Sequence, residues 1–381
     1  MTVNDKALEN VYIIDNLGNK RRLKRIYIGV NGKAKKIADS KLTVDKAYKQ
    51  PTPLSQARGV LAATSIGYYA LFGGGSYDVY NGTKTDYYFS SVVDAYDTSL
   101  IRTTPTPLSQ ARYDLAATSI GNYALFGGGS SRNDNKYSYY NTVDAYNASL
   151  VRTTQTSLSQ ARSVLAATSI GNYALFGGGF YAGVSSVVDA YDTSLVRTTP
   201  TPLSQARSRL AATSIGNYAL FGGGYVTDYH NDYRSSVVDA YNTSLVRTTP
   251  THLSQARDFL ASTSIGDYAL FGGGYSSSVV DAYDTSLVRT TPTPLSKARQ
   301  YLAATSIGNY ALFGGGSHSA SNYDVVDVYD TSLIRTTPTP LSQARYNLSA
   351  TSIGDYALFG GGYPSGVSDV VDAYSLKNIL I

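Results

Sequence analysis

The side chains that could do chemistry in this 381-residue chain are few and are scattered along the sequence. The three histidines are His230, His252 and His318, and their separations in the sequence match no metal-ligand spacing. Cysteine is absent, which excludes thiolate nucleophiles, disulfides and the commonest zinc sites. We therefore predict no metal site and no cofactor.

Carboxylates are the remaining candidates for catalysis, because two carboxyl groups on either side of a glycosidic bond can hydrolyse it. The aspartates that stand outside any recurring motif are Asp114, Asp228, Asp258 and Asp324. The sequence does not bring two of them together, so we predict no catalytic residue. Glycan hydrolysis or lyase chemistry stays as the alternative to a non-enzymatic function.

Other charged residues recur in identical surroundings, once in each of seven copies of a repeated block. The arginines each follow an alanine: Arg58, Arg112, Arg162, Arg207, Arg257, Arg299 and Arg345. The aspartates each follow a valine: Asp94, Asp144, Asp189, Asp239, Asp281, Asp327 and Asp372. A catalytic site is unique, so seven copies indicate a structural role, either pairing between repeats or hydrogen bonding to loop carbonyls.

The repeated block determines which elements must position these side chains. It reads close to ATSIGNYALFGGG and VVDAYDTSLVRTTPTPLSQAR, and the first glycine of its triplet recurs at Gly73, Gly127, Gly177, Gly222, Gly272, Gly314 and Gly360. The mean period of about 48 residues is typical of one supersecondary unit per copy, which is stable only against its neighbours.

Copy three shows how each block divides into strands. Turn residues separate four short apolar or β-branched runs: Leu165 to Ile170, Tyr173 to Phe176, Val187 to Tyr191 and Leu195 to Thr198. Four antiparallel strands in a repeat of this length favour radial blades over a solenoid. We predict an all-β fold, a seven-bladed β-propeller of four-stranded antiparallel blades.

A glycine run after an apolar strand, a tyrosine-containing strand, a turn, an outer strand and a proline-rich link ending in arginine resemble the kelch repeat. The resemblance covers residues 51 to 381. The kelch pattern usually has tryptophan on the outer strand, whereas this chain has no Trp and places arginine there: Arg102, Arg152, Arg197, Arg247, Arg289 and Arg335. The resemblance implies partners that bind across the loops near the channel mouth.

The copies differ at two places. The first is the loop between the glycine triplet and VVDAY, which ranges from Tyr275–Ser278 to Ser76–Ser91 and is dominated by Tyr, Ser, Asn, Asp and Gly. Such mixtures suit recognition surfaces, because tyrosine offers a large contact area at low entropic cost. We predict ligand-binding residues in these loops: Tyr77, Tyr80, Tyr87, Tyr88, Tyr137, Tyr139, Tyr140, Tyr181, Tyr229, His230, Tyr233, His318 and Tyr323.

The second variable place is the pair of residues directly after each Ala-Arg. Its members include aspartate, arginine, phenylalanine and tyrosine, which cannot all occupy equivalent buried positions, so we expect both residues of each pair to face solvent or a ligand. The predicted ligand-binding residues here are Tyr113, Asp114, Arg209, Asp258, Phe259, Tyr301, Tyr346 and Asn347. In an up-and-down blade both variable places lie on one face, and loops on one face are typical binding sites.

The first 45 residues differ from the repeats. Residues 1 to 50 carry 12 Lys and Arg against 5 Asp and Glu, while the rest of the chain carries 20 against 22. Strands are predicted at Val11 to Ile14, Leu23 to Val30 and Lys33 to Ile37, with a hairpin turn at Asn31-Gly32. IYIGVNGKAKKI is similar to short β modules in tail and surface proteins of phages and Gram-positive bacteria. We predict an attachment module at residues 1–45.

The propeller is expected to span residues 46–381, and its seventh blade lacks an outer strand within the repeats. Two segments can supply that strand: residues 46–50, because KAYKQPTP aligns with LVRTTPTP, or Asn378 to Ile381. We favour residues 46–50.

Together these features predict a non-enzymatic recognition or adhesion protein that binds a glycan or a protein through one propeller face. An intracellular kelch-type adaptor is a further alternative. No signal peptide and no membrane span are seen. A virion-associated or cell-surface location is favoured over the cytoplasm, and nucleic acid is not an expected partner.

Overall fold

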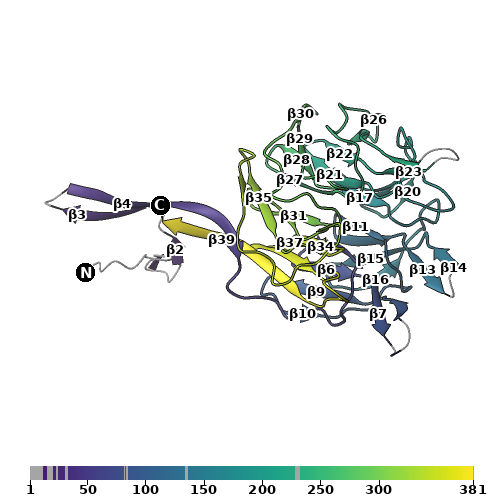
Figure 1. Ribbon diagram of the computed structural model, residues 1–381, viewed down its shortest axis with the longest axis horizontal. Coiled ribbons are helices and arrows are strands. Elements are labelled where there is room, and N and C mark those ends of the chain that lie inside the picture. The colour runs from purple at the N-terminus through teal and green to yellow at the C-terminus, as the bar shows by residue number, and fades with distance from the viewer. Residues whose placement is uncertain are drawn as a thin grey trace.

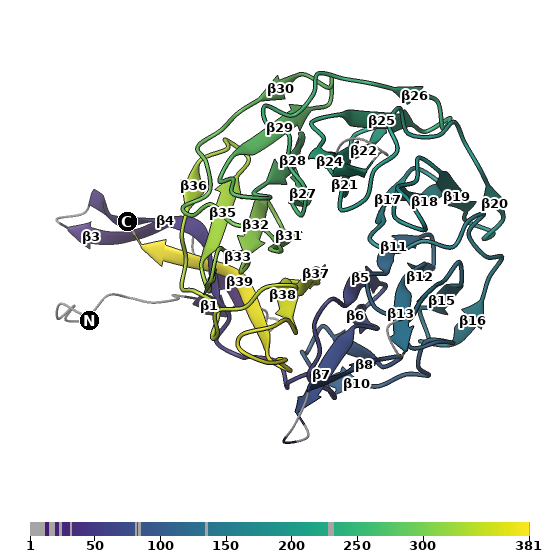
Figure 2. The ribbon, with the colours of Figure 1, turned by 45° about the vertical axis from the view of Figure 1, so that its right-hand side comes forward.

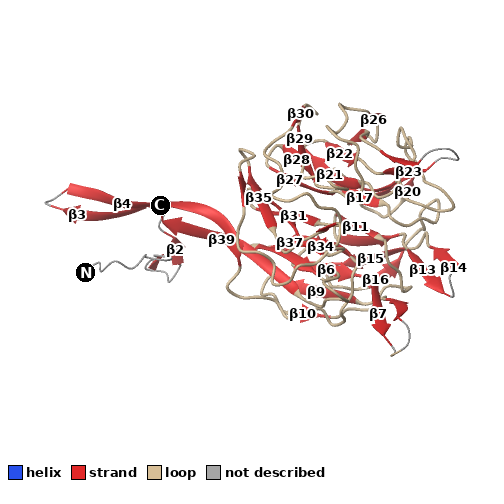
Figure 3. Ribbon diagram, viewed as in Figure 1, coloured by secondary structure: helices blue, strands red, loops and turns tan. Residues whose placement is uncertain are grey.

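The computed structural model describes residues 12–14, 20–22, 25–30, 33–80, 82, 85–133, 136–227 and 232–380. These residues form strands, turns and loops without a helix (Figure 3). Accordingly, no described segment is a helix that could cross a membrane. Seven sheets stand around a central channel, as Figure 2 shows. The chain is a seven-bladed β-propeller.

Each blade has four antiparallel strands, and the same position in every blade is filled by the same part of the repeat. The innermost strands are β5 (Ala62–Ile66), β11 (Ala116–Ile120), β17 (Ala166–Ile170), β21 (Ala211–Ile215), β27 (Ala261–Ile265), β31 (Ala303–Ile307) and β37 (Ser349–Ile353). The second strands are β6 (Tyr69–Gly73), β12 (Tyr123–Gly127), β18 (Tyr173–Gly177), β22 (Tyr218–Gly222), β28 (Tyr268–Gly272), β32 (Tyr310–Gly314) and β38 (Tyr356–Gly360).

The outermost strand is the shortest in six of the blades, with two or three residues. The third strands are β9 (Val93–Asp97), β15 (Val143–Asn147), β19 (Val188–Asp192), β25 (Val238–Asn242), β29 (Val280–Asp284), β35 (Val326–Asp330) and β39 (Val371–Leu380). The outermost strands are β10 (Arg102–Thr103), β16 (Arg152–Thr154), β20 (Arg197–Thr198), β26 (Arg247–Thr248), β30 (Arg289–Thr290), β36 (Arg335–Thr336) and β4 (Lys33–Lys46).

The hydrophobic core lies between blades, not within one. Leu175 and Ala190 of one blade pack against Phe221 and Tyr241 of the next, and the same cluster repeats around the ring. The first glycine of each triplet permits this packing. A Cβ on Gly177 would lie 2.6 Å from the Phe221 ring of the neighbouring blade. A repeat therefore buries its apolar surface only when a neighbour is present.

The recurring arginine and aspartate join neighbouring blades. Arg207 lies in the link between the third and fourth blades, and its backbone N–H donates to the Ser185 carbonyl of the third blade at 3.0 Å. Its guanidinium Nη2 pairs with Asp239 Oδ2 of the fourth blade at 2.7 Å and donates to the Phe221 carbonyl of the same blade at 3.0 Å. Asp239 Oδ1 also binds Arg247 Nη1 of the outermost strand at 3.1 Å. The pairing and the carbonyl hydrogen bonds predicted from the sequence are both present.

These ion pairs are fully buried. The Arg207 and Asp239 side chains have no exposed surface, whereas Arg247 is 24% exposed. Burial lowers the pKa of the Arg207 guanidinium, and the neighbouring Asp239 carboxylate opposes that shift. Arg247, on the outermost strand, stands where the kelch pattern usually has tryptophan. It completes a group in which Arg207 and Arg247 both pair with Asp239.

The seventh blade is closed by the N-terminal part of the chain. β4 is antiparallel to β39, with Lys46 opposite Tyr374 and Ser40 opposite Leu380. The closing strand is thus residues 40–46, and the predicted segment 46–50 covers only its C-terminal end, where the Ala47 N–H still donates to the Ala373 carbonyl at 2.8 Å. Asn378–Leu380 extend the third strand of the blade instead of forming the outermost one.

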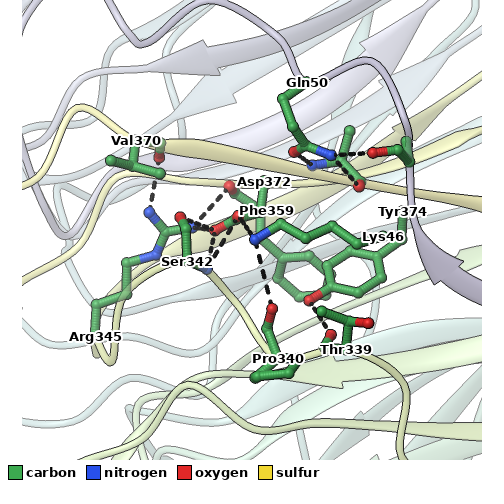
Figure 4. A network of polar contacts seen from close by, with 12 residues as sticks. Lys46, Gln50, Thr339, Pro340, Ser342, Arg345, Phe359, Val370, Asp372 and Tyr374 are labelled. Atoms are coloured by element: carbon green, nitrogen blue, oxygen red, sulfur yellow. Dashed lines mark hydrogen bonds and ion pairs between the residues drawn. The ribbon is translucent and has the colours of Figure 1, made fainter.

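Lys46 explains why the sequence alignment misplaced this strand. It stands opposite Tyr374 as Arg335 stands opposite Tyr329, and its Nζ lies 2.7 Å from Asp372 Oδ1 (Figure 4). Lysine therefore replaces the outer arginine, two residues earlier than the alignment of KAYKQPTP with LVRTTPTP implies. Gln50 then holds the strand by hydrogen bonds with the backbone of Ala373.

β4 continues beyond the blade and carries a small ribbon away from the ring (Figure 1). Its residues 33–39 pair with β3 (Arg25–Val30), in a sheet of order β3-β4-β39-β38-β37. β1 (Tyr12–Ile14) and β2 (Lys20–Arg22) form a separate pair. β4 crosses residue 45 without interruption, so the expected module and the propeller share one strand. The predicted turn at Asn31-Gly32 lies outside the described residues.

Candidate ligand-binding face

The two variable places lie on the same face of the ring, as the up-and-down topology predicts. In six of the seven blades the first residue of the variable pair forms an antiparallel bridge with the residue after the glycine triplet of its own blade. Tyr113 and Ser130, for example, exchange two backbone hydrogen bonds of 2.9 Å. Equivalent bridges join Gly59 to Ser76, Ser163 to Phe180, Ser208 to Tyr225, Gln300 to Ser317 and Tyr346 to Tyr363.

The second residue of each pair belongs to a closed ring of backbone hydrogen bonds around the channel. The N–H of Val164 donates to the Asp114 carbonyl at 2.9 Å, and the N–H of Arg209 donates to the Val164 carbonyl at 3.0 Å. Seven such bonds return to the start, where Val60 donates to Asn347 at 2.9 Å. The ring consists of Val60, Asp114, Val164, Arg209, Phe259, Tyr301 and Asn347, and we call it the mouth ring.

All seven residues of the mouth ring have left-handed backbone conformations, with φ from 47° at Val164 to 57° at Arg209. This conformation is costly for every residue type except glycine, asparagine and aspartate. None of the seven is glycine. Their side chains line a cavity of about 520 Å³ at the channel mouth, together with Tyr113, Tyr137, Tyr139, Phe180 and Tyr225.

The expectation that both residues of each pair face solvent or a ligand is wrong for the first residue of several pairs. Gly59, Ser163, Ser208 and Asp258 are buried. The bridge holds Gly59, Ser163 and Ser208 against their own loops, whereas Asp258 only accepts a backbone hydrogen bond from Tyr275, at 3.0 Å. The second residue of each pair lines the mouth cavity. Asp258 is 2% exposed and pairs with Arg234 at 3.0 Å and with Arg209 at 3.7 Å. It therefore orients two arginines and is not itself a surface residue.

Arg209 and Asp114 place opposite charges on the mouth ring. The Arg209 guanidinium lies between the rings of Tyr225 and Phe259, 4.7 Å from each ring centre. Burial raises the pKa of the Asp114 carboxyl to about 7, and the Arg209 charge only partly opposes this shift. Near neutral pH the cavity thus holds a fixed cation and a carboxyl that either donates or accepts a hydrogen bond.

The long variable loops form small hairpins above this cavity. They are β7 (Ser76–Tyr80) with β8 (Thr85–Phe89), β13 (Ser130–Asn133) with β14 (Lys136–Tyr139), β23 (Tyr225–Thr227) with β24 (Asp232–Arg234), and β33 (Ser317–His318) with β34 (Ser321–Asn322). Their tyrosines are presented to solvent: Tyr87 is 65% exposed, and Tyr88, Tyr137 and Tyr233 are 43–49% exposed. Tyr181, in the shorter loop of the third blade, is 49% exposed.

Many of these aromatic rings contact one another. Tyr77 stacks on Tyr88 with ring centres 5.4 Å apart, and Phe89 stacks on Tyr113 at 5.0 Å. Tyr139 contacts Tyr137 and, in the next blade, Tyr181. The face is therefore a preorganised aromatic surface that spans neighbouring blades.

A second cavity of about 450 Å³ lies beside the first. Its lining includes Asp78, Tyr87, Arg132 and Tyr363. Val60, Tyr113 and Asn347 line both cavities, so the two are adjacent and share a wall.

The remaining predicted residues are distributed unevenly. Tyr346 lines the second cavity, Tyr140 is half-buried and hydrogen-bonded to Ser131, and His318 and Tyr323 are half-buried in the sixth blade. Tyr229 and His230 lie outside the described residues, as does the side chain of Tyr80. Asp324 lines neither cavity. Within the described ranges no three acidic or histidine side chains gather to hold a metal.

Sequence reasoning missed several lining residues: Asp78, Arg132, Phe180, Tyr225 and Tyr363. Val60 and Val164 belong to the variable pairs that were expected to face solvent or a ligand, and both line the mouth cavity. Phe180, Tyr225 and Tyr363 directly follow the glycine triplet, a position that the sequence does not distinguish from the rest of its loop.

Comparison with known proteins supports the fold. No protein-family model matches the chain, and no curated protein matches it. The solved structure of YjhT is similar, with a TM-score of 0.56 over 87% of this chain and 99% of that chain, at 10% sequence identity. At this identity the likeness concerns architecture alone.

Proposed function

We propose that this chain is a kelch-like, non-enzymatic recognition protein that binds its partner on the face formed by the mouth ring and the tyrosine-rich hairpins. The supporting observation is the mouth ring itself. Seven positions share one left-handed backbone conformation, which glycine would adopt without strain, yet all seven carry side chains. Strained backbone held at a concave site is typical of function. Unconstrained loop drift would not retain it in every copy.

The chemistry of the face suits recognition. Tyrosines supply rigid aromatic surface with a polar hydroxyl, and such residues dominate binding energy at interfaces. The cavity of about 520 Å³ is within the range of small-molecule sites. The N-terminal strands extend away from the ring, which suits the attachment role proposed for them (Figure 1). Adhesion at a phage tail or a bacterial surface is the context we propose.

The test replaces tyrosines on the proposed binding face and compares the effect on binding with that of a tyrosine replaced on the opposite face. Full-length protein is applied to glycan and protein arrays, together with a triple variant Tyr87→Ser, Tyr137→Ser and Tyr181→Ser. Tyr68→Ser is the matched control, because Tyr68 is 77% exposed at a turn on the opposite face. We expect the triple variant to lose the bound partner and the control to keep it, with melting temperatures within about 2 °C because exposed sites contribute little to stability. Equal binding by both variants would refute the assignment of the face.

Glycan hydrolysis remains the second candidate, and one observation favours it. A carboxyl whose pKa is raised to about 7 can act as a general acid near neutral pH, and Asp114 has this property. Release of reducing sugar from a bound glycan by the wild type, and its loss in Asp114→Asn, would favour the enzyme over the binding protein.

A further inference from the structure

Two cavities on the binding face share one wall. Val60, Tyr113 and Asn347 line both the mouth cavity and the second cavity, and Tyr113 is stacked on Phe89. A ligand confined to one cavity would leave the other empty, whereas an extended ligand can occupy both by crossing Tyr113.

The two cavities are alike in chemistry although they arise from different blades. The mouth cavity contains Asp114 and Arg209 among aromatic rings, and the second cavity contains Asp78 and Arg132 among aromatic rings. Arg209 lies 4.7 Å from the centre of the Tyr225 ring within the mouth cavity, and Arg132 of the second cavity lies 5.4 Å from the centre of the Tyr137 ring, which belongs to the mouth cavity. Cavities that repeat the same chemistry suit a ligand made of repeating units.

Among the residues that the structure describes, none donates a hydrogen bond to Asp78 Oδ1 or to the Asp114 carboxyl. Asp78 Oδ1 is buried and accepts no hydrogen bond from any residue that the structure describes. Asp114 is influenced by the Arg209 charge, and no described side chain donates a hydrogen bond to it. A buried carboxylate oxygen without a donor is costly, so a ligand hydroxyl or water is needed to satisfy it.

We infer that the face binds an oligosaccharide across both cavities, with one sugar unit on each side of Tyr113. This inference rests on the proposed function and specifies its ligand. Sugar hydroxyls satisfy the Asp78 and Asp114 carboxylates, and the C–H faces of the rings pack on the tyrosines. A peptide fits less well, because its successive side chains differ whereas the two cavities do not.

The experiment measures how affinity depends on ligand length. Full-length protein is screened on a glycan array that carries each sugar as a monosaccharide and as oligomers, and each bound sugar is then titrated calorimetrically as a length series. We expect an increase in affinity of about tenfold or more between one unit and two or three units. Asp78→Asn and Asp114→Asn should each reduce the affinity for the oligomer by about tenfold, since each removes a charged hydrogen-bond acceptor.

Asp355→Asn is the matched control, because Asp355 is exposed at a turn on the opposite face and four other copies carry asparagine there: Asn122, Asn172, Asn217 and Asn309. Its affinity should equal that of the wild type. Thermal melting of all three variants shows whether any lost binding is due to lost folding.

Four results would overturn the inference. An affinity that does not change with ligand length would mean a single subsite. Oligomer binding that survives both cavity substitutions would place the ligand elsewhere. Binding to a protein array but to no glycan, removed by the triple tyrosine variant, would identify a protein partner and leave the proposed function intact. Binding to neither array, or binding that the triple variant retains, would overturn the proposed function as well.

Discussion

Asp239 has a structural role in this propeller. It is fully buried and pairs with both Arg207 and Arg247. Removing one partner of a buried ion pair costs far more than the pair contributes, because an uncompensated charge is left without water. The same group of charged residues recurs around the ring, and this recurrence already indicated a structural role from the sequence.

Asp239→Ala should therefore lower the free energy of unfolding by about 3–5 kcal/mol, because Arg207 stays buried without its carboxylate. Arg247→Ala should lower it by about 1 kcal/mol or less, because Arg247 is 24% exposed and Arg207 still neutralises Asp239. Urea denaturation of the two variants measures both values. Similar losses would show that the buried arginine does not depend on Asp239.

Asp114 lines the mouth cavity, and its raised pKa links stability to pH. Its pKa in the folded protein, about 7, is above its unfolded value. The folded state therefore favours the protonated carboxyl, so the contribution of this group is complete below about pH 4 and is lost as the pH rises to about 7.

Asp114→Asn should be as stable as the wild type at pH 4 and more stable at pH 8, by on the order of a few kcal/mol, because asparagine carries no charge to bury. Denaturation curves of both proteins at the two pH values measure the difference. Asp355→Asn controls for the substitution itself. A constant difference between the Asp114→Asn variant and the wild type at both pH values would contradict the shifted pKa.

At the scale of elements, the sequence predicted the strands that recur in every copy. It did not predict the left-handed backbone conformation that the copies share at the mouth ring. Glycine pairs, alternating strands and the DTS turns located the four strands of the third blade within about two residues. The sequence singled out the mouth-ring positions as variable but did not predict their shared backbone: Val164, Arg209 and Tyr301 adopt one conformation without a common side chain. The burial of Asp258 was missed because its arginine partners come from other segments of the chain.

Exchanging the residue types at two positions of the mouth ring tests how much its left-handed backbone conformation costs. Val164 is β-branched and has φ of 47°, whereas Asn347 has φ of 53° and belongs to a residue type that tolerates this conformation. Val164→Asn should raise the free energy of unfolding by about 1 kcal/mol, and Asn347→Val should lower it by a similar amount. Equilibrium unfolding of the two variants tests this. Changes of the same sign in both would show that packing outweighs backbone strain.

At the scale of the whole molecule, each blade is stabilised by packing against its neighbours. The stability of the ring therefore depends on the contact that joins its last blade to the N-terminal part of the chain. Residues 40–46 of β4 supply the last strand, and Val44 is buried in the cluster that joins the sixth and seventh blades. The sequence showed that an outer strand was missing and that the N-terminal side supplies it. It misplaced the strand because Lys46 replaces the arginine that marks this position in every other blade.

A pair of truncations tests the closure. Removing residues 1–39 leaves the strand that pairs with β39, whereas removing residues 1–46 exposes the unpaired edge of β39 and leaves Asp372 without Lys46. We expect the first truncation to melt within about 2 °C of the full chain and the second to melt about 5 °C lower or more. A synthetic peptide of residues 33–50 added to the second should restore the higher melting temperature, because it can pair with the vacant edge as a donated strand. Equal melting of both truncations, or no effect of the peptide, would show that the ring is stable without a strand from its N-terminal end.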